Sequence, residues 1–402
     1  MEKAINIDNA IIGPGKPTYI IAEVGINHNG DEETAYQLID AAIEAQVDAV
    51  KFQKRYLPAL YPEDIINNPE KYEQTFQYMI PLLKKVELSN DTFIRIKDYC
   101  DKKEITFICT PFDEISADFI HDLGTVAFKV ASADLTNDDL LTHLAAFEKP
   151  LIMSTGMSTW DEIDHTASLM ESLDAAYAFL HCRSVYPVWP REVNLGMINK
   201  LRKYGVPVGY SGHEIGITVA LVAASMGAEI IEKHITLDRK QEGPDHKASL
   251  EPYEFKRLVR DIRVADQALG RDHRYLLRGE VLNRELFAKS LVAKETIERG
   301  TVVQEGMIKV QGPAKGLPPY KRKDLIGRKT IRTIEKDECF VDEDLGQSGN
   351  KNFNNAFKGD WGLIARFTDY QDMLKYEPKV IEFHLAENDF DIPFEPSGNL
   401  DC

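Results

Sequence analysis

The sequence predicts a (βα)8 TIM barrel, followed by a small β-rich module and an incomplete α/β tail. Three observations support the barrel. Short apolar segments bounded by turn residues alternate with helical patterns over about 250 residues, the usual length of this fold. Polar side chains stand at or just beyond the C-terminal end of each predicted strand. The last two predicted strands each end close to a histidine, His213 and His234.

The predicted strands are apolar runs, each separated from the next by a helical pattern. In order, they span 19–25, 49–53, 106–112, 127–132, 151–156, 176–182, 206–210 and 230–236. After the first strand, Asp31 is placed to cap a helix whose apolar residues, among them Leu38 and Ala42, recur with helical spacing. The small-residue stretch 217–227 predicts a helix between the last two strands, and the amphipathic stretch 255–269 predicts one that closes the barrel.

Changes in composition along the chain set the expected domain boundaries. We expect the barrel over 1–280, the β-rich module over 285–345, an Asn-rich linker over 346–358 and a partial strand–helix–strand segment over 359–402. Residues 270–283 are expected to form a charged connector. Within the barrel, the polar segment 54–89 is longer than an ordinary loop between a strand and a helix, and such loops tend to carry function.

Composition excludes several classes of partner. The net charge of −17 disfavours nucleic acid, because a phosphate backbone repels such a surface. No apolar run approaches the roughly 20 residues that cross a bilayer, and the N-terminus lacks the pattern of a secretory signal. The five cysteines are odd in number and lack CxxC spacing, which is typical of reduced thiols in the cytoplasm.

His213 and His234 are candidate ligands of one metal ion. They end neighbouring parallel strands, which lie about 4.8 Å apart, so both imidazoles can reach the same ion. Two histidines would leave coordination positions for water and for substrate oxygens. The alternative is that both are hydrogen-bonded structural residues.

The other strand ends predict a pocket for anions. Lys51 and Lys129 supply positive charge, and Glu23 is a carboxylate placed to handle a proton. Hydroxyl donors complete the ring: Thr110, Ser132, Ser154, Ser184 and Ser211. Each hydroxyl alone is better explained as a strand-end cap, but a ring drawn from all the strands favours a phosphate or phosphate-and-carboxylate pocket. A metal there would polarise a carbonyl or activate water.

A series of short motifs follows the same order as in a known family. They are 21–30 (IAEVGINHNG), 51–53 (KFQ), 128–132 (FKVAS), 154–157 (STGM), 180–182 (LHC), 186–187 (YP), 209–214 (GYSGHE), 232–238 (EKHITLD), 245–246 (DH) and 249–252 (SLEP). With these motifs, residues 18–345 resemble the sialic acid synthase family, in which a (βα)8 barrel precedes an antifreeze-like domain of the β-clip type.

The resemblance implies a phosphoenolpyruvate-dependent transferase that forms a carbon–carbon bond. Phosphoenolpyruvate would condense with N-acetylmannosamine, its 6-phosphate or a related N-acyl hexosamine, giving a nonulosonic acid, or its 9-phosphate, and inorganic phosphate. The resemblance also implies a head-to-tail, domain-swapped homodimer in which the antifreeze-like domain covers the partner's active site.

The site roles that the resemblance implies fall into three groups. His213 and His234 would hold Mn²⁺ or Mg²⁺ and, with Glu23, form the catalytic group. Phosphoenolpyruvate would be bound by Lys51, Thr110, Lys129, Ser132, Ser154, Ser184 and Ser211. The sugar would be bound by Gln53, Tyr186, Asp245 and, from the antifreeze-like domain, Lys315.

Three positions depart from the bacterial pattern of the family. Ser184 stands where Asn is common, and Gly212 stands where an Asp precedes the first metal-binding histidine. The loop that carries Arg-Pro-Gly in bacterial members is Gly312-Pro313-Ala314 here. Gly212 and this loop resemble the animal-type enzyme, which uses the 6-phosphate of N-acetylmannosamine, so both the free and the phosphorylated sugar stay open.

Two other functions are compatible with the residues. One is a different metal-dependent barrel enzyme, an aldolase or isomerase acting on a phosphosugar. The other is a binding protein that has kept the barrel, because fold does not fix function. The presence of Glu23, Lys51, Lys129, His213 and His234 together favours an enzyme over a binding protein.

Overall fold

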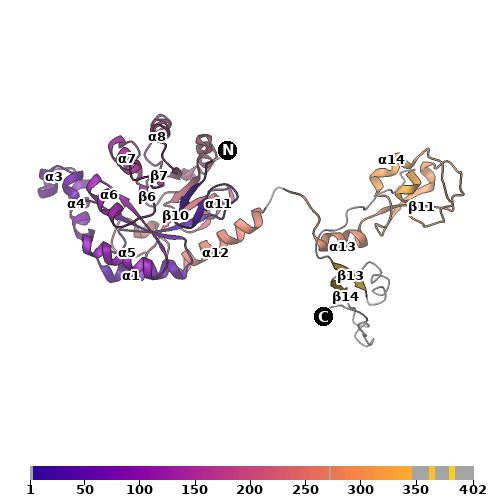
Figure 1. Ribbon diagram of the computed structural model, residues 1–402, viewed down its shortest axis with the longest axis horizontal. Helices are drawn as coiled ribbons and strands as arrows, with labels where there is room; N and C mark the ends of the chain where they lie inside the picture. Colours follow the sequence, from indigo (N-terminus) through magenta and orange to yellow (C-terminus); the bar gives the residue numbers. More distant parts are fainter. Residues whose placement is uncertain (1–2, 271–272, 346–361, 367–379, 385–402) are drawn as a thin grey trace, which may run out of the picture. The chain divides into compact units, whose positions relative to one another are not determined.

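The computed structural model describes residues 3–270, 273–345, 362–366 and 380–384 (Figure 1). The chain divides into two compact units, residues 1–272 and 273–402, and each has its own apolar core. They are treated separately below.

The first unit is a closed barrel of parallel strands, as the sequence predicts. The strands follow the chain around the barrel, and the last pairs with the first, with Ile230 opposite Tyr19 and His234 opposite Glu23. In order they are β3 (Tyr19–Gly25), β4 (Ala49–Lys54), β5 (Thr106–Pro111), β6 (Phe128–Val130), β7 (Leu151–Ser154), β8 (Tyr177–Cys182), β9 (Val208–Gly212) and β10 (Ile230–His234).

Helices surround the barrel and bury its outer face (Figure 1). Asp31 accepts a hydrogen bond from the backbone of Thr34 and so caps the first of them, as expected, while Thr159 and Glu162 form a capping box at another. The helices of this unit that cover the barrel are α1 (Glu32–Glu44), α5 (Asn90–Lys102), α6 (Glu114–Asp122), α7 (Asp138–Ala145), α8 (Trp160–Ser172), α9 (Pro190–Val193), α10 (Gly196–Leu201), α11 (Thr218–Ser225) and α12 (Pro252–Leu269).

An N-terminal hairpin covers one end of the barrel, which the sequence did not lead us to expect. Strands β1 (Ile5–Ile7) and β2 (Ala10–Ile12) pair antiparallel. Their buried isoleucines join one cluster with barrel residues that include Ile21, Ile108 and Ile230. Since Ile230 begins β10 and this cluster lacks the residues of the opposite strand ends, the hairpin packs at the N-terminal side of the barrel.

The long segment after β4 is largely helical. It contains α2 (Leu57–Leu60), α3 (Glu63–Asn67) and α4 (Gln74–Val86). Ile80, Leu83 and Val86 of α4 are buried, whereas α2 and α3 bury no side chain fully. This segment is therefore a structured insertion that the barrel holds through one face of α4.

The second unit begins with a helix, α13 (Arg278–Phe287), where the sequence predicted only a charged connector. At the start of this helix, the Glu280 carboxylate accepts a hydrogen bond from the Leu277 backbone N–H at 2.9 Å. The apolar side chains of the helix, including Leu282 and Leu286, are exposed. The antiparallel strands β11 (Ser290–Ala293) and β12 (Ile308–Gln311), with the short α14 (Arg322–Leu325), enclose a small core that includes Leu291 and Phe340.

The predicted tail is only partly described. Strands β13 (Gly362–Arg366) and β14 (Val380–His384) pair in parallel, in agreement with the two strands expected there. The helix predicted at 369–376 and the linker predicted at 346–358 lie outside the described residues.

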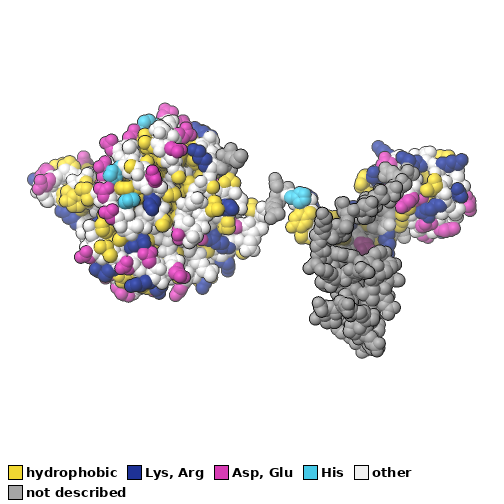
Figure 2. All heavy atoms as spheres, in the orientation of Figure 1, with side chains coloured by type: hydrophobic (Ala, Val, Ile, Leu, Met, Phe, Trp, Pro, Cys, Tyr) yellow, Lys and Arg dark blue, Asp and Glu magenta, His cyan; other side chains and the backbone are white. Residues whose placement is uncertain are grey.

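The surface of the barrel mixes charges of both signs. Figure 2 shows acidic and basic side chains interspersed over the face in view. None of the described helices is both long enough and apolar enough to cross a bilayer.

Candidate active site

A cavity of about 430 Å³ lies among the C-terminal strand ends of the barrel. It brings together the site residues that the sequence predicted within the barrel, although their roles remain predictions. They are Glu23, Lys51, Gln53, Thr110, Lys129, Ser132, Ser154, Ser184, Tyr186, Ser211, His213, His234 and Asp245. Lys315 belongs to the second unit, where its side chain is exposed.

Strand geometry explains why these residues converge. Side chains alternate across a strand, so residues two apart share a face. Several pairs with this spacing line the cavity, among them Lys51 with Gln53, Ser211 with His213, and Glu232 with His234. The strands that carry these pairs therefore present two side chains each to the same space.

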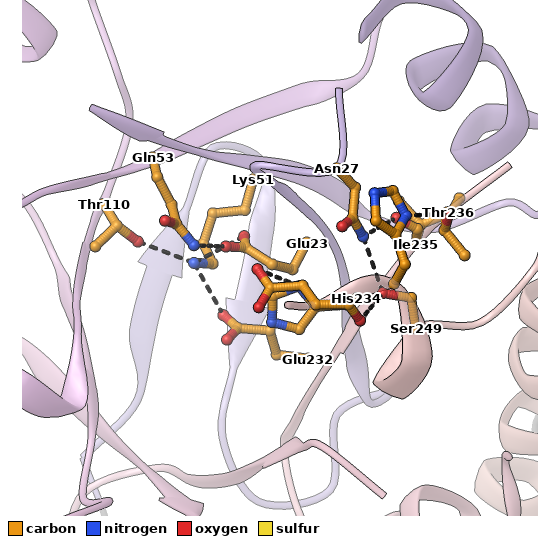
Figure 3. A network of polar contacts seen from close by, with 12 residues as sticks. Glu23, Asn27, Lys51, Gln53, Thr110, Glu232, His234, Ile235, Thr236 and Ser249 are labelled. Atoms are coloured by element: carbon orange, nitrogen blue, oxygen red, sulfur yellow. Dashed lines mark hydrogen bonds and ion pairs between the residues drawn. The ribbon is translucent and has the colours of Figure 1, made fainter. Parts of the chain in front are cut away.

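Lys51 lies at the centre of a buried polar cluster (Figure 3). Its Nζ lies 2.8 Å from Glu23 Oε2 and 3.8 Å from Glu232 Oε2, and it donates a hydrogen bond to Thr110 Oγ1 at 2.9 Å. Gln53 Nε2 donates to the other oxygen of Glu23 at 2.8 Å. The cluster thus connects four strands of the barrel through one ammonium group.

In this cluster, burial disfavours the charged form of each group, whereas ion pairing favours it. Burial raises the pKa of Glu23, although Lys51 opposes the change, so this carboxyl is suited to carry a proton. Burial disfavours the charged form of Lys51, but Glu23 and Glu232 outweigh it and raise the Lys51 pKa. Burial also disfavours charge on Glu232, but Lys51 and Lys129 outweigh it and lower the Glu232 pKa.

Lys129 is also buried, but it differs from Lys51 in its partners. Its Nζ donates to Ser154 Oγ at 2.6 Å and to the Val130 carbonyl at 2.9 Å, and it has no ion pair with any described residue. Burial lowers its pKa, because the opposing influence of the Glu232 and Glu23 charges is smaller than the effect of the lost hydration. A bound anion would supply the missing negative charge.

Two hydroxyl groups converge above Gly156. A Cβ atom at this position would lie 2.6 Å from Ser132 Oγ and 2.4 Å from Ser184 Oγ, so a side chain there would fill the space that the hydroxyls face. Glycine therefore keeps this part of the pocket open. This arrangement suits an oxygen-rich ligand that accepts hydrogen bonds from both serines.

The two histidines lie close together, with ring centroids 5.5 Å apart. His213 Nδ1 lies 2.8 Å from the Arg183 carbonyl oxygen, which fixes this nitrogen as the donor and leaves Nε2 as a potential ligand. His234 Nδ1 is buried and has no hydrogen-bond partner among the described residues. Burial lowers the pKa of His213 to about 4 and that of His234 well below 6.5, so both rings are neutral.

This arrangement fits a divalent cation. Metal ions bind neutral imidazole, and an orphaned buried ring nitrogen needs a partner. Among the described residues, no group of three or more His, Cys, Asp and Glu side chains has the geometry of a metal site. Two histidines would therefore leave the remaining coordination positions to water and substrate.

Asp245 reaches the site from a loop tied to β10. Its carboxylate lies 3.8 Å from His234 Nδ1, and burial raises its pKa to about 7, with a further contribution from Glu23. Ser249 Oγ donates to the Asp245 carbonyl at 2.7 Å and accepts from Asn27 Nδ2 at 2.9 Å (Figure 3). These bonds hold Asp245 beside the ring of His234.

Tyr186 covers the histidines from the mouth of the cavity. The centroid of its ring lies 4.0 Å from that of His213 and 5.9 Å from that of His234. Its side chain is exposed, so it is positioned to contact a ligand that enters from solvent.

Two charged residues of the cavity, Glu232 and Arg55, were not among the predicted site residues. Both follow the alternation already visible in the sequence: Glu232 lies two residues before His234, and Arg55 two residues after Gln53. In contrast, Asp113 follows a strand as expected but caps α6 through Ser116 and accepts a bond from the Tyr56 backbone, and it does not line the cavity.

Comparisons with known proteins show which families the two units are similar to. The model of the NeuB family matches residues 38–274, and that of the SAF domain matches 288–346. An N-acetylneuraminate-9-phosphate synthase from Homo sapiens is 36% identical over 344 residues, which cover 85% of this chain and 96% of that protein. An N,N'-diacetyllegionaminic acid synthase from Campylobacter jejuni is 35% identical and covers 80% of this chain and 98% of its own.

Solved structures show the same architecture. The N-acetylneuraminic acid synthetase of Leptospira borgpetersenii, solved with citrate, superposes with a TM-score of 0.64 at 34% identity, over 70% of this chain and 95% of that one. A 3-deoxy-D-arabino-heptulosonate 7-phosphate synthase of Thermotoga maritima has a TM-score of 0.53 at 17% identity, over 67% of this chain and 94% of its own, and shares the fold.

Proposed function

Because the chain belongs to the NeuB family, we propose that it is a transferase that condenses phosphoenolpyruvate with a sugar of the N-acetylmannosamine type, free or 6-phosphorylated. The products are a nonulosonic acid, or its 9-phosphate, and inorganic phosphate. One observation carries the proposal: a single cavity combines two buried lysines, converging hydroxyls, two neutral histidines and a carboxyl with a raised pKa.

The two lysines bind the enolpyruvate. Lys129 lacks a carboxylate partner among the described residues and takes one of its anionic groups, while Lys51 takes another as it shares its charge with Glu23 and Glu232. The hydroxyl donors Ser132, Ser154 and Ser184 orient the phosphate and carboxylate oxygens. This holds C3 of the enolpyruvate towards the sugar aldehyde.

Glu23 handles the proton at the aldehyde. The C3 carbon forms a bond with the aldehyde carbon, and the aldehyde oxygen takes up a proton as it becomes a hydroxyl group. The raised pKa of Glu23 allows it to carry that proton, and Gln53 fixes its orientation. Water then adds at C2, and phosphate leaves as the 2-keto acid forms.

His213 and His234 would hold Mn²⁺ or Mg²⁺. When bound, such an ion would polarise the aldehyde carbonyl as a Lewis acid. The described residues contribute to this by keeping both imidazoles neutral and by fixing His213 through the Arg183 carbonyl.

We also propose a homodimer that exchanges its antifreeze-like domains head to tail, as the resemblance implies. Support comes from the segment at the start of the second unit, which exposes large apolar side chains. Leu277, Leu286 and Phe287 are 57%, 65% and 67% exposed. A second copy of the chain would cover them, because apolar patches of this kind mark association surfaces.

Phosphate release tests the reaction. Protein freed of metal by a chelator is incubated with phosphoenolpyruvate and either N-acetylmannosamine or its 6-phosphate, with and without Mn²⁺. We expect phosphate release that requires a sugar and is restored by Mn²⁺. Conversion of a phosphosugar without consumption of phosphoenolpyruvate would instead identify an aldolase or isomerase and overturn the proposal.

A further inference from the structure

Arg55 is a buried cation in the cavity to which the proposed reaction gives no role. It is 6% exposed, follows β4 directly and lines the cavity beside Gln53. Its Nη2 donates to Gln53 Oε1 at 2.5 Å, and its guanidinium lies over the Phe112 ring, 4.5 Å from the centroid. These two contacts hold the planar group at the cavity wall.

The charge of Arg55 is not neutralised by a contact within the described protein. No ion pair joins it to any described carboxylate, although Glu87 and Asp245 are near enough to act on its charge. Glu87 is itself paired with Lys54 at 2.6 Å. Because an uncompensated buried charge costs several kcal/mol, its presence beside an open cavity indicates that a ligand supplies the counter-charge.

The position of Arg55 separates it from the enolpyruvate pocket. Lys51, Gln53 and Arg55 follow one face of β4 and its extension, and four residues of extended chain span about 13 Å. Hydrogen bonds and an ion pair connect them in the order Lys51, Glu23, Gln53, Arg55. Arg55 therefore lies beyond Glu23, on the side away from the lysine.

The order from Glu23 to Arg55 fits the acceptor sugar, with its aldehyde end at Glu23 and its last carbon towards Arg55. The aldehyde carbon must lie at Glu23 and the enolpyruvate, so the far end of its carbon chain extends towards Arg55. Lys84 is not placed to bind the far end of the sugar. It is exposed, donates to the Ile66 carbonyl at 2.6 Å and does not line the cavity. Arg55 is the cation placed for the remote end of the sugar.

We propose that Arg55 binds a phosphate group on the last carbon of the acceptor, so that the preferred substrate is the 6-phosphorylated sugar. A planar guanidinium matches phosphate oxygens through paired hydrogen bonds. Three carbons from the enolpyruvate precede those of the sugar in the product, so a 6-phosphate becomes a 9-phosphate. The Homo sapiens relative is named a 9-phosphate synthase. This inference rests on the proposed function.

The test compares two acceptors and three variants. Phosphate release is measured with N-acetylmannosamine 6-phosphate and with N-acetylmannosamine, and kcat/KM is determined for each. We expect wild type to prefer the phosphorylated sugar. In Arg55→Gln the ratio of the two kcat/KM values should fall roughly ten- to hundred-fold, the range expected for a lost charged hydrogen bond. Arg55→Lys should lose less, because it keeps the charge without the planar fork.

A matched control removes the charge of an arginine outside the cavity. Arg260 is an exposed arginine of α12 that pairs with Asp261, and Arg260→Gln should leave the ratio unchanged. An equal loss for both sugars in Arg55→Gln would show that Arg55 only positions Gln53 and Glu23, and would overturn the proposal. A wild-type preference for the free sugar would overturn it as well.

Binding separates this proposal from the proposed reaction. If neither sugar releases phosphate, the reaction is wrong, and calorimetry then measures binding of N-acetylmannosamine 6-phosphate without phosphoenolpyruvate. Weaker binding to Arg55→Gln than to wild type, with thermal unfolding unchanged, would support the phosphate subsite. Equal binding to the two proteins, or binding to neither, would overturn it.

Discussion

The buried lysines of this barrel differ in the groups that balance their positive charge. Lys51 shares its charge with two carboxylates, Lys233 pairs with Glu214, and Lys129 has hydrogen bonds only to Ser154 and a carbonyl group. Removing Lys51 would leave Glu23 and Glu232 buried without their cation, so its effects would mix stability with binding. Lys129 is therefore the cleaner probe of the anion pocket.

We predict that Lys129→Ala raises the KM for phosphoenolpyruvate roughly ten- to hundred-fold, the loss expected for a charged hydrogen bond. The KM for the sugar should change less, because Lys129 lies among the residues that we propose bind the enolpyruvate. Initial rates with each substrate varied in turn measure both constants. A larger change in the sugar constant would mean that the pocket is assigned to the wrong substrate.

His28 is a second residue whose burial has a measurable consequence. Burial, with a smaller contribution from the charge of Arg55, lowers its pKa from 6.5 to about 4. The unfolded chain thus binds a proton that the folded barrel does not. The stability from His28 is complete above pH 6.5 and is lost as the pH falls from 6.5 towards 4.

We predict that His28→Gln makes the free energy of unfolding less sensitive to acid. Between pH 7 and pH 5, wild type should lose about 2 kcal/mol more than this variant. Urea unfolding at the two pH values measures the difference, and the exposed His165→Gln is the matched control. Equal losses in wild type and His28→Gln would show that His28 is not the group responsible.

At the scale of elements, a buried ion pair joins the segment that follows β9 to β10. Lys233 Nζ lies 3.2 Å from Glu214 Oε1 and donates to the Glu214 carbonyl at 2.7 Å, while Tyr210 donates to the other carboxylate oxygen at 2.6 Å. A Cβ at Gly212 would lie 2.7 Å from both Glu214 Oε2 and Tyr210 Cε1. The space that an aspartate would need at position 212 is thus occupied.

We predict that Lys233→Met destabilises the barrel by about 3–5 kcal/mol, because it strands the buried Glu214 carboxylate. Adding Glu214→Gln removes that charge and should recover part of the loss. Urea denaturation of the two single variants and the double variant gives the coupling between the sites. Losses that simply add would contradict a direct interaction.

The elements that could be predicted are those with a repeated pattern. Each barrel strand is an apolar run with a polar end, and this is visible even in β6, which has three residues. The strands β1 and β2 also have three residues each, but their burial depends on barrel residues far along the chain. Helix α13 was missed because its charged residues resemble a connector.

The site residues at the strand ends could be predicted. Those found only by following the alternation of side chains away from these ends were harder to predict. Gln53 and His234 stand at or next to the ends of their strands and were identified. Glu232 was overlooked although it shares a face with His234, and Arg55 lies beyond the end of β4 in a segment that looked like a loop. The pairing of Lys51 with two carboxylates could not be foreseen, because it joins three separate strands.

At the scale of the whole molecule, the two units carry different residues of the predicted active site. The barrel holds the cavity, whereas Lys315 belongs to the second unit. If the domains exchange between two copies, each site needs one barrel and one antifreeze-like domain from different chains. That arrangement makes complementation possible between two defective proteins.

We predict that Glu23→Ala and a chain ending at Gly279 are each poorly active alone and recover activity when mixed as heterodimers. The mixed dimer joins an intact barrel to an intact antifreeze-like domain, so about one site per dimer should work. Co-purification through two different tags isolates it for phosphate-release assays. Inactive mixed dimers, or a monomeric active enzyme by light scattering, would rule out the exchange.

The N-terminal hairpin also bears on the order in which products leave. β1 and β2 pack on one end of the barrel, and apolar side chains fill its interior on that side. The cavity lies at the opposite strand ends, where Lys51 and Lys129 are buried and Tyr186 is exposed. In the proposed reaction, phosphate forms beside the buried lysines, deeper than the larger sugar acid, so the acid should depart first. Inorganic phosphate should then compete with phosphoenolpyruvate, and not with the sugar, in product-inhibition kinetics; the opposite pattern would point to a second exit.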